Sequence, residues 1–423
     1  MSSPVRSMTR GQRRPRTDPD AHHTACPGCG VSYYLRRDHL GLRSICRKCG
    51  QAFYLLPPSA SPPTAVLLED PEQSGDNQFL VGRLWLDLRP GQILDGDFLV
   101  RRPLGRGGLS QVFQVFDLRR NLDLAVKLPL SATLDRLPRE VFINEAVAWL
   151  KPALHPNLIA CDQVRLHLGQ PVIVMEYIQG LDLARLAAGG RGILYHGPPR
   201  ASCLALLDIF IQVARGLKYI HSLKLSRLDL KPRNVLVENS GRALIGDYGP
   251  VSSGPGRLPE KPDLGGGQQG EGQETKLSNT KLLGTPQYFS PEAAAGGSKS
   301  GRAVDLWALA LTALECFLGH RPWKMGSVAG LALEQYLAEG GRPTYLPPKL
   351  ADYFRQALAS NPADRLKDAD EVAARLAEIY EEVADRPYGR PEPQPPLETS
   401  ERLARKDASF RELGRPDLCR ADY

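Results

Sequence analysis

The sequence has no long apolar run. Its longest apolar stretch, LWALALTALECFL at 306–318, is interrupted by Glu315 and is shorter than the roughly 20 residues that a membrane-spanning helix needs. The basic segment at 1–21 is not followed by an apolar stretch, so we expect neither a secretory signal nor a membrane anchor. These absences predict a cytoplasmic protein, and 423 residues are enough for two or three domains.

Beyond its first 50 residues the sequence has no net charge. Residues 1–50 contain ten Lys/Arg and three Asp/Glu, a balance of +7 that equals the net charge of the whole chain. A basic surplus at one end is typical of a solvated, disordered tail, which is our interpretation of 1–21. Nucleic-acid binding there is the weaker alternative, because charge alone does not specify a groove.

Cysteine is also scarce, and four of the eight cysteines stand alone in the sequence. The other four form two CxxC pairs in an internal repeat, CPGCGVSYYL at 26–35 and CRKCGQAFYL at 46–55. Two such pairs separated by sixteen residues are typical of a closed structural zinc site, whereas a reducing compartment disfavours the alternative of two disulfides. The repeat resembles the short zinc ribbon of some bacterial regulatory proteins. The predicted zinc ligands are Cys26, Cys29, Cys46 and Cys49.

Composition and periodicity divide the rest of the chain. Short alternating apolar runs predict strands from about residue 93, and amphipathic periodicity predicts helices after about 180, including 202–221 and 303–318. Residues 400–413 have the composition of a short charged helix. The predicted segments are a basic tail (1–21), a zinc ribbon (22–56), a Pro/Ser/acidic linker (57–92), a globular region (93–383) with a β-rich part (93–175), a helical part (180–383) and a Gly-rich insertion (250–280), and a disordered tail (384–423).

Two elements of the β-rich part have the composition of a phosphate-binding site. LGRGGLSQVF at 104–113 places glycines between apolar strands, where backbone N–H groups can cover phosphates, although ordinary turn chemistry would also explain them. In LDLAVKLPL, strand alternation places Ala125 and Lys127 on one face. In REVFINEAVAWL, Glu145 shares a helical stripe with apolar residues, so we expect it to pair with Lys127 unless it is an ordinary exposed residue.

The segment SRLDLKPRNVLVENSGRALIGDYG at 226–249 contains hard oxygen ligands at short intervals. Asn234 and Asp247 are predicted to hold magnesium, which takes the rest of its coordination shell from waters and phosphate oxygens. Asp229 is then left to accept a proton from a substrate hydroxyl. The three residues together predict phosphoryl-transfer chemistry.

With these motifs in order, residues 93–383 resemble a eukaryotic-type serine/threonine protein kinase of the kind found in bacteria. The resemblance implies an α+β, bilobal fold with a β-rich N-lobe and a helical C-lobe, which the zinc ribbon would precede. It also implies transfer of the γ-phosphate of ATP to protein Ser/Thr hydroxyls, with Mg²⁺ or Mn²⁺ as the cofactor. Protein substrates are the implied partners.

The resemblance also assigns individual residues. HPNLI at 155–159 follows the helix as in the family, GTPQYFSPE at 284–292 resembles the end of the activation segment, and Glu292 would pair with Arg365. Asp305 would brace the catalytic loop. The implied catalytic residues are Asp229, Lys231, Lys127, Glu145 and Thr285, and the implied nucleotide-binding residues are Leu104, Gly105, Gly107, Gly108, Val112, Ala125, Lys127, Met175, Glu176 and Tyr177.

The catalytic loop departs from the family pattern. Arg227 and Leu228 replace the usual His-Arg before Asp229, and a leucine cannot clamp a phosphorylated activation segment as the usual arginine does. Arg227 instead is a candidate partner for Asp305. Thr275, Ser278 and Thr280 are candidate autophosphorylation sites in a flexible loop. The alternatives to an active kinase are a pseudokinase scaffold and a regulator that binds nucleic acid through the zinc ribbon.

Overall fold

The computed structural model describes most of the region between residue 88 and residue 419. The described residues form two compact units, the first ending at Arg139 and resuming over Gln163–Tyr177, the second comprising Glu140–Asp162 and the chain from Ile178 onward. The ranges described are 22–25, 32–35, 43–45, 48, 52–54, 88–107, 109–130, 139–167, 170–188, 192–226, 228–247, 285–295, 301–338, 346–394 and 398–419.

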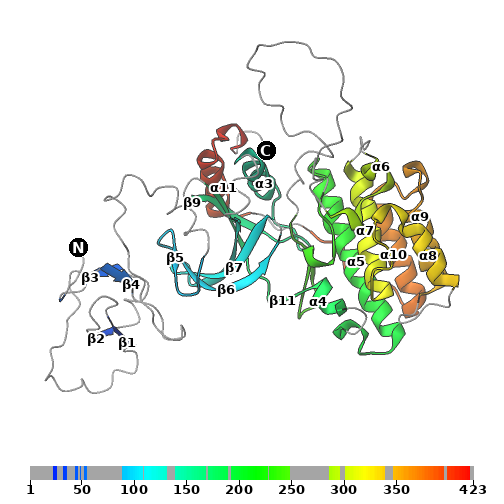
Figure 1. The fold of residues 1–423 in the computed structure, drawn as a ribbon, viewed down its shortest axis with the longest axis horizontal. Coiled ribbons are helices and arrows are strands. Elements are labelled where there is room, and N and C mark those ends of the chain that lie inside the picture. The colour runs from blue at the N-terminus through cyan, green and yellow to red at the C-terminus, as the bar shows by residue number, and fades with distance from the viewer. Residues whose placement is uncertain are drawn as a thin grey trace, which may run out of the picture. The chain divides into compact units, whose positions relative to one another are not determined.

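A six-stranded antiparallel sheet forms the first unit (Figure 1). Apolar residues alternate along its strands, so that one face, which includes Phe98, Phe113, Val126 and Val174, forms a buried core. The strands, in the spatial order β5-β6-β7-β8-β10-β9, are β5 (Ile93–Leu94), β6 (Phe98–Arg106), β7 (Ser110–Asp117), β8 (Leu122–Pro129), β10 (Gln170–Glu176) and β9 (Cys161–His167).

Helices dominate the second unit, where α5, α7 and α10 run side by side (Figure 1). Aromatic rings join α7 to two of its neighbours, since the ring of Phe317 on α7 is centred 6.3 Å from that of Phe210 on α5 and 5.8 Å from that of Phe354 on α9. The helices are α3 (Arg139–Leu150), α4 (Leu183–Ala187), α5 (Pro199–Ser222), α6 (Pro291–Ala294), α7 (Gly301–Leu318), α8 (Ala329–Ala338), α9 (Pro348–Ala357), α10 (Ala369–Ala384) and α11 (Ser400–Glu412), with 3₁₀ turns η4 (Ile193–Tyr195), η5 (Pro232–Asn234), η6 (Pro286–Tyr288), η7 (Gly326–Val328), η8 (Pro362–Asp364) and η9 (Pro416–Leu418).

The two long predicted helices are present, with one change at an end. α7 covers the predicted 303–318 and is buried along most of its length. α5 begins three residues before Ser202, at Pro199, because a proline is well suited to the first turn of a helix. Ser202, the first residue of the predicted range, is therefore a buried residue within the helix. Within the ranges described, no helix combines the length and apolarity needed to cross a membrane.

The segment that follows α3 belongs to the second unit, although the sequence placed it in the β-rich part. Ile159 and Leu158 pair with Ile245 at the end of β13, and the Ile245 amide donates to the Asn157 carbonyl at 2.9 Å. Gly216 of α5 permits this approach, because a Cβ there would lie 2.8 Å from the Asn157 carbonyl oxygen. A small sheet in the order β11 (Gly180–Asp182), β12 (Val235–Glu238) and β13 (Ala243–Ile245) completes this region.

The ends of the predicted globular region need correction. The linker does not reach 92, because Leu88 packs against the core of the first sheet and the Gly91 amide donates to the Val100 carbonyl at 2.8 Å. The tail after 384 is not disordered over the residues described, since α11 forms close to the predicted 400–413 and buries Phe410. The charged composition of the tail wrongly predicted disorder, because Arg390 and Lys406 have partners far away in the sequence, at Asp208 and Pro152.

Two short hairpins are described in the front segment. β1 (His22–Ala25) pairs with β2 (Ser32–Leu35), and β3 (Arg43–Ile45) pairs with β4 (Ala52–Tyr54). The four predicted zinc ligands, the basic tail and the insertion at 250–280 lie outside the described residues. The interpretations placed on them, including nucleic-acid binding, therefore stay predictions.

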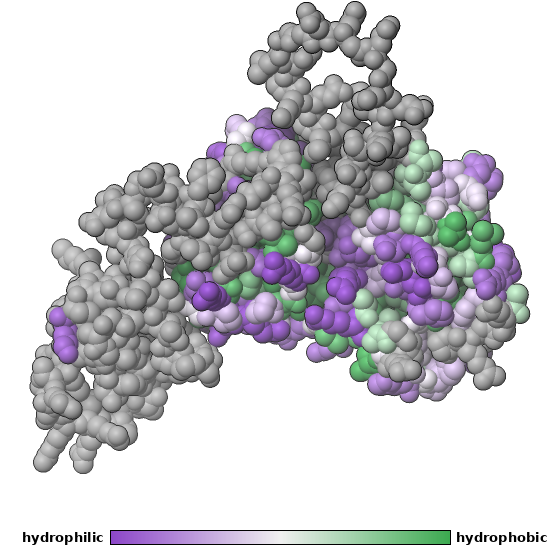
Figure 2. Space-filling model, viewed as in Figure 1, coloured by the Kyte–Doolittle hydropathy of each residue, from purple (hydrophilic) through white to green (hydrophobic). Residues whose placement is uncertain are grey.

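The face of the helical unit in Figure 2 is largely polar, with an apolar area over α8. Leu331 of this helix is 75% exposed. Met325 and Val328, in and just before η7, are also exposed. Single apolar side chains at a surface are common in monomeric proteins, and nothing in the described residues covers these three.

We expect His155 to make stability depend on pH. Its ring stacks on Tyr219 at 4.9 Å, and burial lowers its pKa from 6.5 to about 4, although the charge of Glu392 opposes this shift. His155 therefore binds a proton more readily in the unfolded chain than in the folded chain. The free energy of unfolding is thus highest above pH 6.5 and decreases as the pH falls from 6.5 towards 4. Between pH 7 and pH 5 we expect a loss on the order of 1 kcal/mol, measured from thermal unfolding. A His155→Gln variant with the same loss would contradict this.

Candidate active site

A carboxylate, an ammonium group and a hydroxyl meet at the start of the catalytic loop. The Lys231 Nζ donates to Oδ2 of Asp229 and, at 3.0 Å, to Oγ1 of Thr285. The Thr285 hydroxyl in turn donates to Oδ1 of Asp229 at 3.1 Å. Thr285 lies 56 residues after Asp229, so the fold brings together groups that the sequence separates. Both oxygens of Asp229 are held, and its side chain remains 21% exposed.

Asn234 joins this loop to the turn that carries Asp247. Its Nδ2 donates to the Asp229 carbonyl at 2.7 Å and lies 3.5 Å from Oδ2 of Asp247. Because Nδ2 is used in this way, Oδ1 is the atom of Asn234 that suits a hard cation. Asp247 has a φ of 56°, a left-handed conformation that aspartate tolerates better than most residues. The donor set fits Mg²⁺ or Mn²⁺, and Asn234 and Asp247 are the residues that would hold it.

Asp305 of α7 holds the main chain immediately before Asp229. Its side chain is fully buried, and it accepts from the Leu228 amide at 2.7 Å and from the His221 ring at 2.9 Å. The predicted bracing role of Asp305 is confirmed by these contacts. Arg227, the partner proposed from the sequence, lies outside the described residues. Sequence reasoning missed His221, whose only signal is a histidine on the buried face at the end of α5.

The end of the activation segment is tied to the helical unit as predicted. Arg365 donates to both carboxylate oxygens of Glu292 at 2.8 and 2.9 Å, and its guanidinium lies 4.5 Å from the Trp307 ring. Burial is the largest single influence on the Glu292 carboxyl and would raise its pKa, but hydrogen bonds from Arg365, Ser290 and the backbone, together with the charge of Arg365, lower the pKa overall. Tyr288 donates to Glu315 at 2.5 Å, a contact that the sequence did not predict.

Five of the predicted nucleotide-binding residues of the first unit lie on one face of its sheet. The cross-strand partners are Gly105 with Val112, Val112 with Lys127, and Ala125 with Met175, and partners in a sheet share a face. Ala125 and Lys127 are two residues apart on β8, so all five residues point to the face opposite the apolar core. The predicted separation of Ala125 and Lys127 from the core face is therefore correct.

The remaining predicted nucleotide-binding residues are placed as follows. The Gly107 amide donates to the Ser110 carbonyl at 2.8 Å and closes the turn between β6 and β7, while Gly108 lies outside the described residues. Leu104 is on β6, Glu176 ends β10, and the Tyr177 hydroxyl accepts from Arg102 at 2.9 Å. Glu145 lies half-buried on α3 in the second unit, so its pairing with Lys127 stays a prediction.

Comparison with known proteins agrees with this geometry. The family described as the protein kinase domain matches residues 98–375, and the chain belongs to this family. The serine/threonine-protein kinase SSK22 of Saccharomyces cerevisiae is 30% identical over 52% of this chain and 16% of its own length. The serine/threonine-protein kinase PknL of Mycobacterium tuberculosis is 28% identical over 71% of this chain and 70% of its own length.

A further relative and a solved structure are also similar to this chain. The probable serine/threonine-protein kinase SCO3848 of Streptomyces coelicolor is 28% identical over 66% of this chain. The chain spans 39% of that relative and still less of SSK22. The crystal structure of the Mycobacterium tuberculosis PknI kinase domain is 24% identical, with a TM-score of 0.47, and covers 69% of this chain and 99% of the solved chain.

Breaking the pair between Arg365 and Glu292 should destabilise the helical unit. The Arg365 side chain is only 2% exposed, so Arg365→Ala leaves a partly buried carboxylate without its partner and removes the packing on Trp307. We expect a loss of about 3 kcal/mol in the free energy of unfolding, measured by urea denaturation. Arg355→Ala, which breaks an exposed pair with Glu334, is the control and should cost much less stability than Arg365→Ala. Equal losses would contradict the assignment.

Proposed function

We propose that the chain is a serine/threonine protein kinase that transfers the γ-phosphate of ATP to hydroxyl groups of protein substrates. The proposal depends on one observation: Lys231 and Thr285 both donate hydrogen bonds to the Asp229 carboxylate, and Asn234 and Asp247 lie beside it. Phosphoryl transfer needs a carboxylate near the attacking hydroxyl and cations near the phosphates, and this arrangement supplies a place for both. Membership of the protein kinase domain family supports the same reaction.

The catalytic loop residues have separate tasks in this proposal. Asp229 orients the substrate hydroxyl and accepts its proton as the phosphoryl group departs. Lys231 stabilises negative charge on the transferred phosphoryl group, and it holds the Asp229 carboxylate by direct contact. Thr285 holds both groups in one geometry and shapes the site for the acceptor hydroxyl. Mg²⁺ or Mn²⁺, held by Asn234 and Asp247, supplies charge neutralisation for the phosphates when it is bound.

The first sheet provides the nucleotide site in this proposal. Val112, Ala125 and Met175 offer a largely apolar surface for the adenine ring. Leu104 of β6 would add to this surface, and the backbone of Glu176 and Tyr177 would offer hydrogen bonds to the edge of the ring. The Gly105–Gly108 turn would cover the phosphates with backbone N–H groups. Lys127, only 7% exposed, would contact the phosphates and pair with Glu145.

We also propose that the kinase does not depend on a phosphate clamp at its catalytic loop. The Leu228 side chain is 6% exposed and apolar, so it offers no charge to a phosphorylated activation segment. Asp305 instead holds the Leu228 amide, which fixes the loop without any modification. Autophosphorylation at Thr275, Ser278 or Thr280 would then change the loop that carries these residues without being required for the geometry of Asp229.

Replacing Asp229 tests the activity directly. Asp229→Asn keeps the size of the side chain but removes the proton acceptor, so we expect transfer of labelled γ-phosphate to a generic basic protein to fall about 100- to 10,000-fold. Asp352→Asn, on the exposed surface of α9, is the matched control and should keep full activity. Equal labelling by the wild-type chain and Asp229→Asn would exclude Asp229 as the base. No labelling by either, with ATP still bound, would favour a pseudokinase.

A structural zinc ion in the front segment is a second part of the proposal. The pairs Ala25–Ser32 and Ile45–Ala52 close two hairpins, and each encloses six residues that contain one CxxCG sequence. Two hairpins with the same register around the same motif support a pair of zinc knuckles. The proposed ligands are Cys26, Cys29, Cys46 and Cys49.

Metal analysis tests the zinc site. We expect one zinc ion per purified chain, because four thiolates complete a tetrahedral shell. The double variant Cys26→Ser/Cys46→Ser should lose the ion, whereas Cys419→Ser, which changes a lone cysteine after η9, should retain it. Metal-free wild-type protein prepared under reducing conditions would refute the site.

A further inference from the structure

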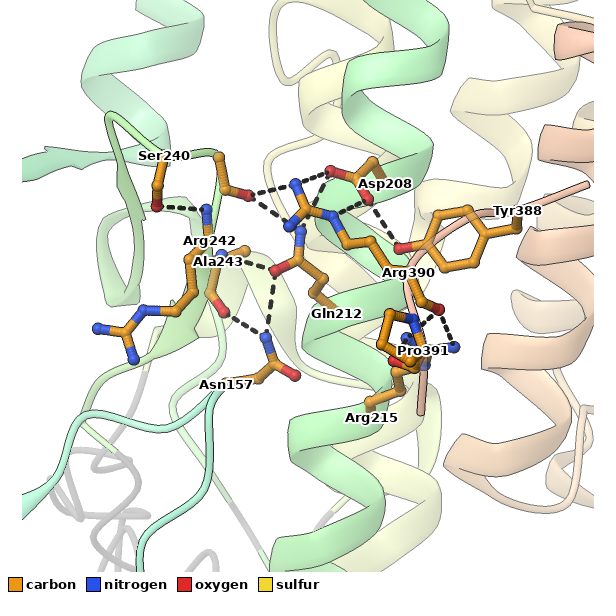
Figure 3. Close-up of polar contacts among 11 residues, drawn as sticks. Asn157, Asp208, Gln212, Arg215, Ser240, Arg242, Ala243, Tyr388, Arg390 and Pro391 are labelled. Atoms are coloured by element: carbon orange, nitrogen blue, oxygen red, sulfur yellow. Dashed lines mark hydrogen bonds and ion pairs between the residues drawn. The ribbon is translucent and has the colours of Figure 1, made fainter. Parts of the chain in front are cut away.

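The chain after α10 is anchored to α5 by a cluster of charged and aromatic side chains. Arg390 donates to both carboxylate oxygens of Asp208, at 2.7 and 2.8 Å, and the Tyr388 hydroxyl donates to the same carboxylate at 2.7 Å (Figure 3). Arg215 donates in the opposite direction, to the Pro391 carbonyl at 2.8 Å, and its guanidinium lies 5.3 Å from the Tyr388 ring. A two-pronged Arg–carboxylate contact of this kind fixes orientation as well as position.

This anchor continues by hydrogen bonds towards the strand that precedes Asp247. Gln212, one turn after Asp208 on α5, donates to Asp208 at 3.2 Å and accepts from the Ala243 amide at 3.0 Å (Figure 3). Arg390 itself donates to the Gly241 carbonyl at 3.2 Å. Ala243 begins β13, and Asp247 lies four residues further on. Arg390 of the tail therefore contacts the turn before β13, both directly and through Asp208 and Gln212.

A second anchor lies on α11. Lys406 is only 5% exposed, and its Nζ donates to the Pro152 carbonyl at 2.7 Å and pairs with Glu398 at 2.9 Å. Burial lowers the pKa of Lys406, against the opposing effect of Glu398. A lysine is seldom buried to this extent unless its charge has a fixed partner. The buried hydrogen bond from Lys406 to the Pro152 carbonyl is thus a structural contact of the fold.

The chain around Cys161 and Asp162 contacts the part of α11 just before Lys406. Arg402 donates to the Cys161 carbonyl, and Arg405 donates to Asp162 at 3.1 Å. Residues 152–162 connect α3 to β9, so α11 contacts both ends of the connection that follows the helix carrying Glu145. Pro152 is only seven residues after Glu145 in the sequence.

We propose that the described residues 388–394 and 398–410, the C-terminal strap, form an internal positioning element that keeps the kinase in its active geometry. The strap holds β13, which leads to Asp247, and the 152–162 segment, which follows Glu145. Arg390 and Lys406 are its two positioning residues. This inference rests on the proposed kinase function for its effect on rate, but the contacts themselves can be tested without activity.

The first experiment compares Arg390→Ala with Arg390→Lys in the full chain, at a temperature where thermal unfolding shows each variant to be folded. We expect Arg390→Ala to lower kcat about 3- to 30-fold and to raise the Mg²⁺ concentration for half-maximal rate, with the KM for the protein substrate unchanged. Arg390→Lys keeps the positive charge but cannot donate the paired hydrogen bonds of a guanidinium to Asp208, so it should recover part of the rate. Arg415→Ala, which breaks an exposed pair just beyond the strap, should change neither quantity. Unchanged kcat and Mg²⁺ response in Arg390→Ala would overturn the proposal.

The second experiment follows amide hydrogen exchange in the same proteins. Faster exchange is expected in residues 152–162 and 241–247 of an Arg390→Ala/Lys406→Ala double variant, and not in Arg415→Ala. If the wild-type chain has no kinase activity but exchange still rises in these two segments, the proposed function fails and the positioning contacts stand. If the wild-type chain is active and exchange in these segments is unchanged, the strap is not a positioning element.

Discussion

The burial of the Asp305 carboxylate is the constraint on which the catalytic loop depends. A carboxylate removed from water costs several kcal/mol unless donors replace its hydration. Among the described residues, the Leu228 amide and the His221 ring donate to the buried Asp305 carboxylate. The first of these donors belongs to the residue before Asp229. Because the buried charge must be satisfied, the main chain at the start of the loop is confined to one position.

Backbone contacts then carry this constraint through the rest of the site. The Asn234 side chain donates to the Asp229 carbonyl. The Thr312 hydroxyl, whose nearer acceptor is the Ala308 carbonyl at 2.7 Å, lies 3.3 Å from the Leu230 carbonyl. The Gly246 amide donates to the Asn234 carbonyl at 2.8 Å, so the turn at Asp247 is built on the loop. Hydrogen bonds to the main chain therefore position the site more than contacts between its charged side chains do.

Local patterns in the sequence carried most of what could be predicted. Strand alternation separated Lys127 from the core, and the spacing of Asp229, Asn234 and Asp247 indicated residues that the fold does bring together. The tail was misjudged because Arg390 and Asp208 are 182 residues apart, and no periodicity links a surface arginine to one distant carboxylate. His221 was missed for a similar reason, since its partner Asp305 is 84 residues away.

The position of the C-terminal strap in the chain has a consequence for biosynthesis. Domains fold during translation from the N-terminal end, and residues 388–410 emerge from the ribosome after every helix and strand of the matched family region. Until then Asp208 lacks the guanidinium of Arg390, and the Pro152 carbonyl lacks the Lys406 ammonium. A nascent chain thus carries every side chain of the proposed active site before the contacts between the C-terminal strap and the rest of the helical unit can form.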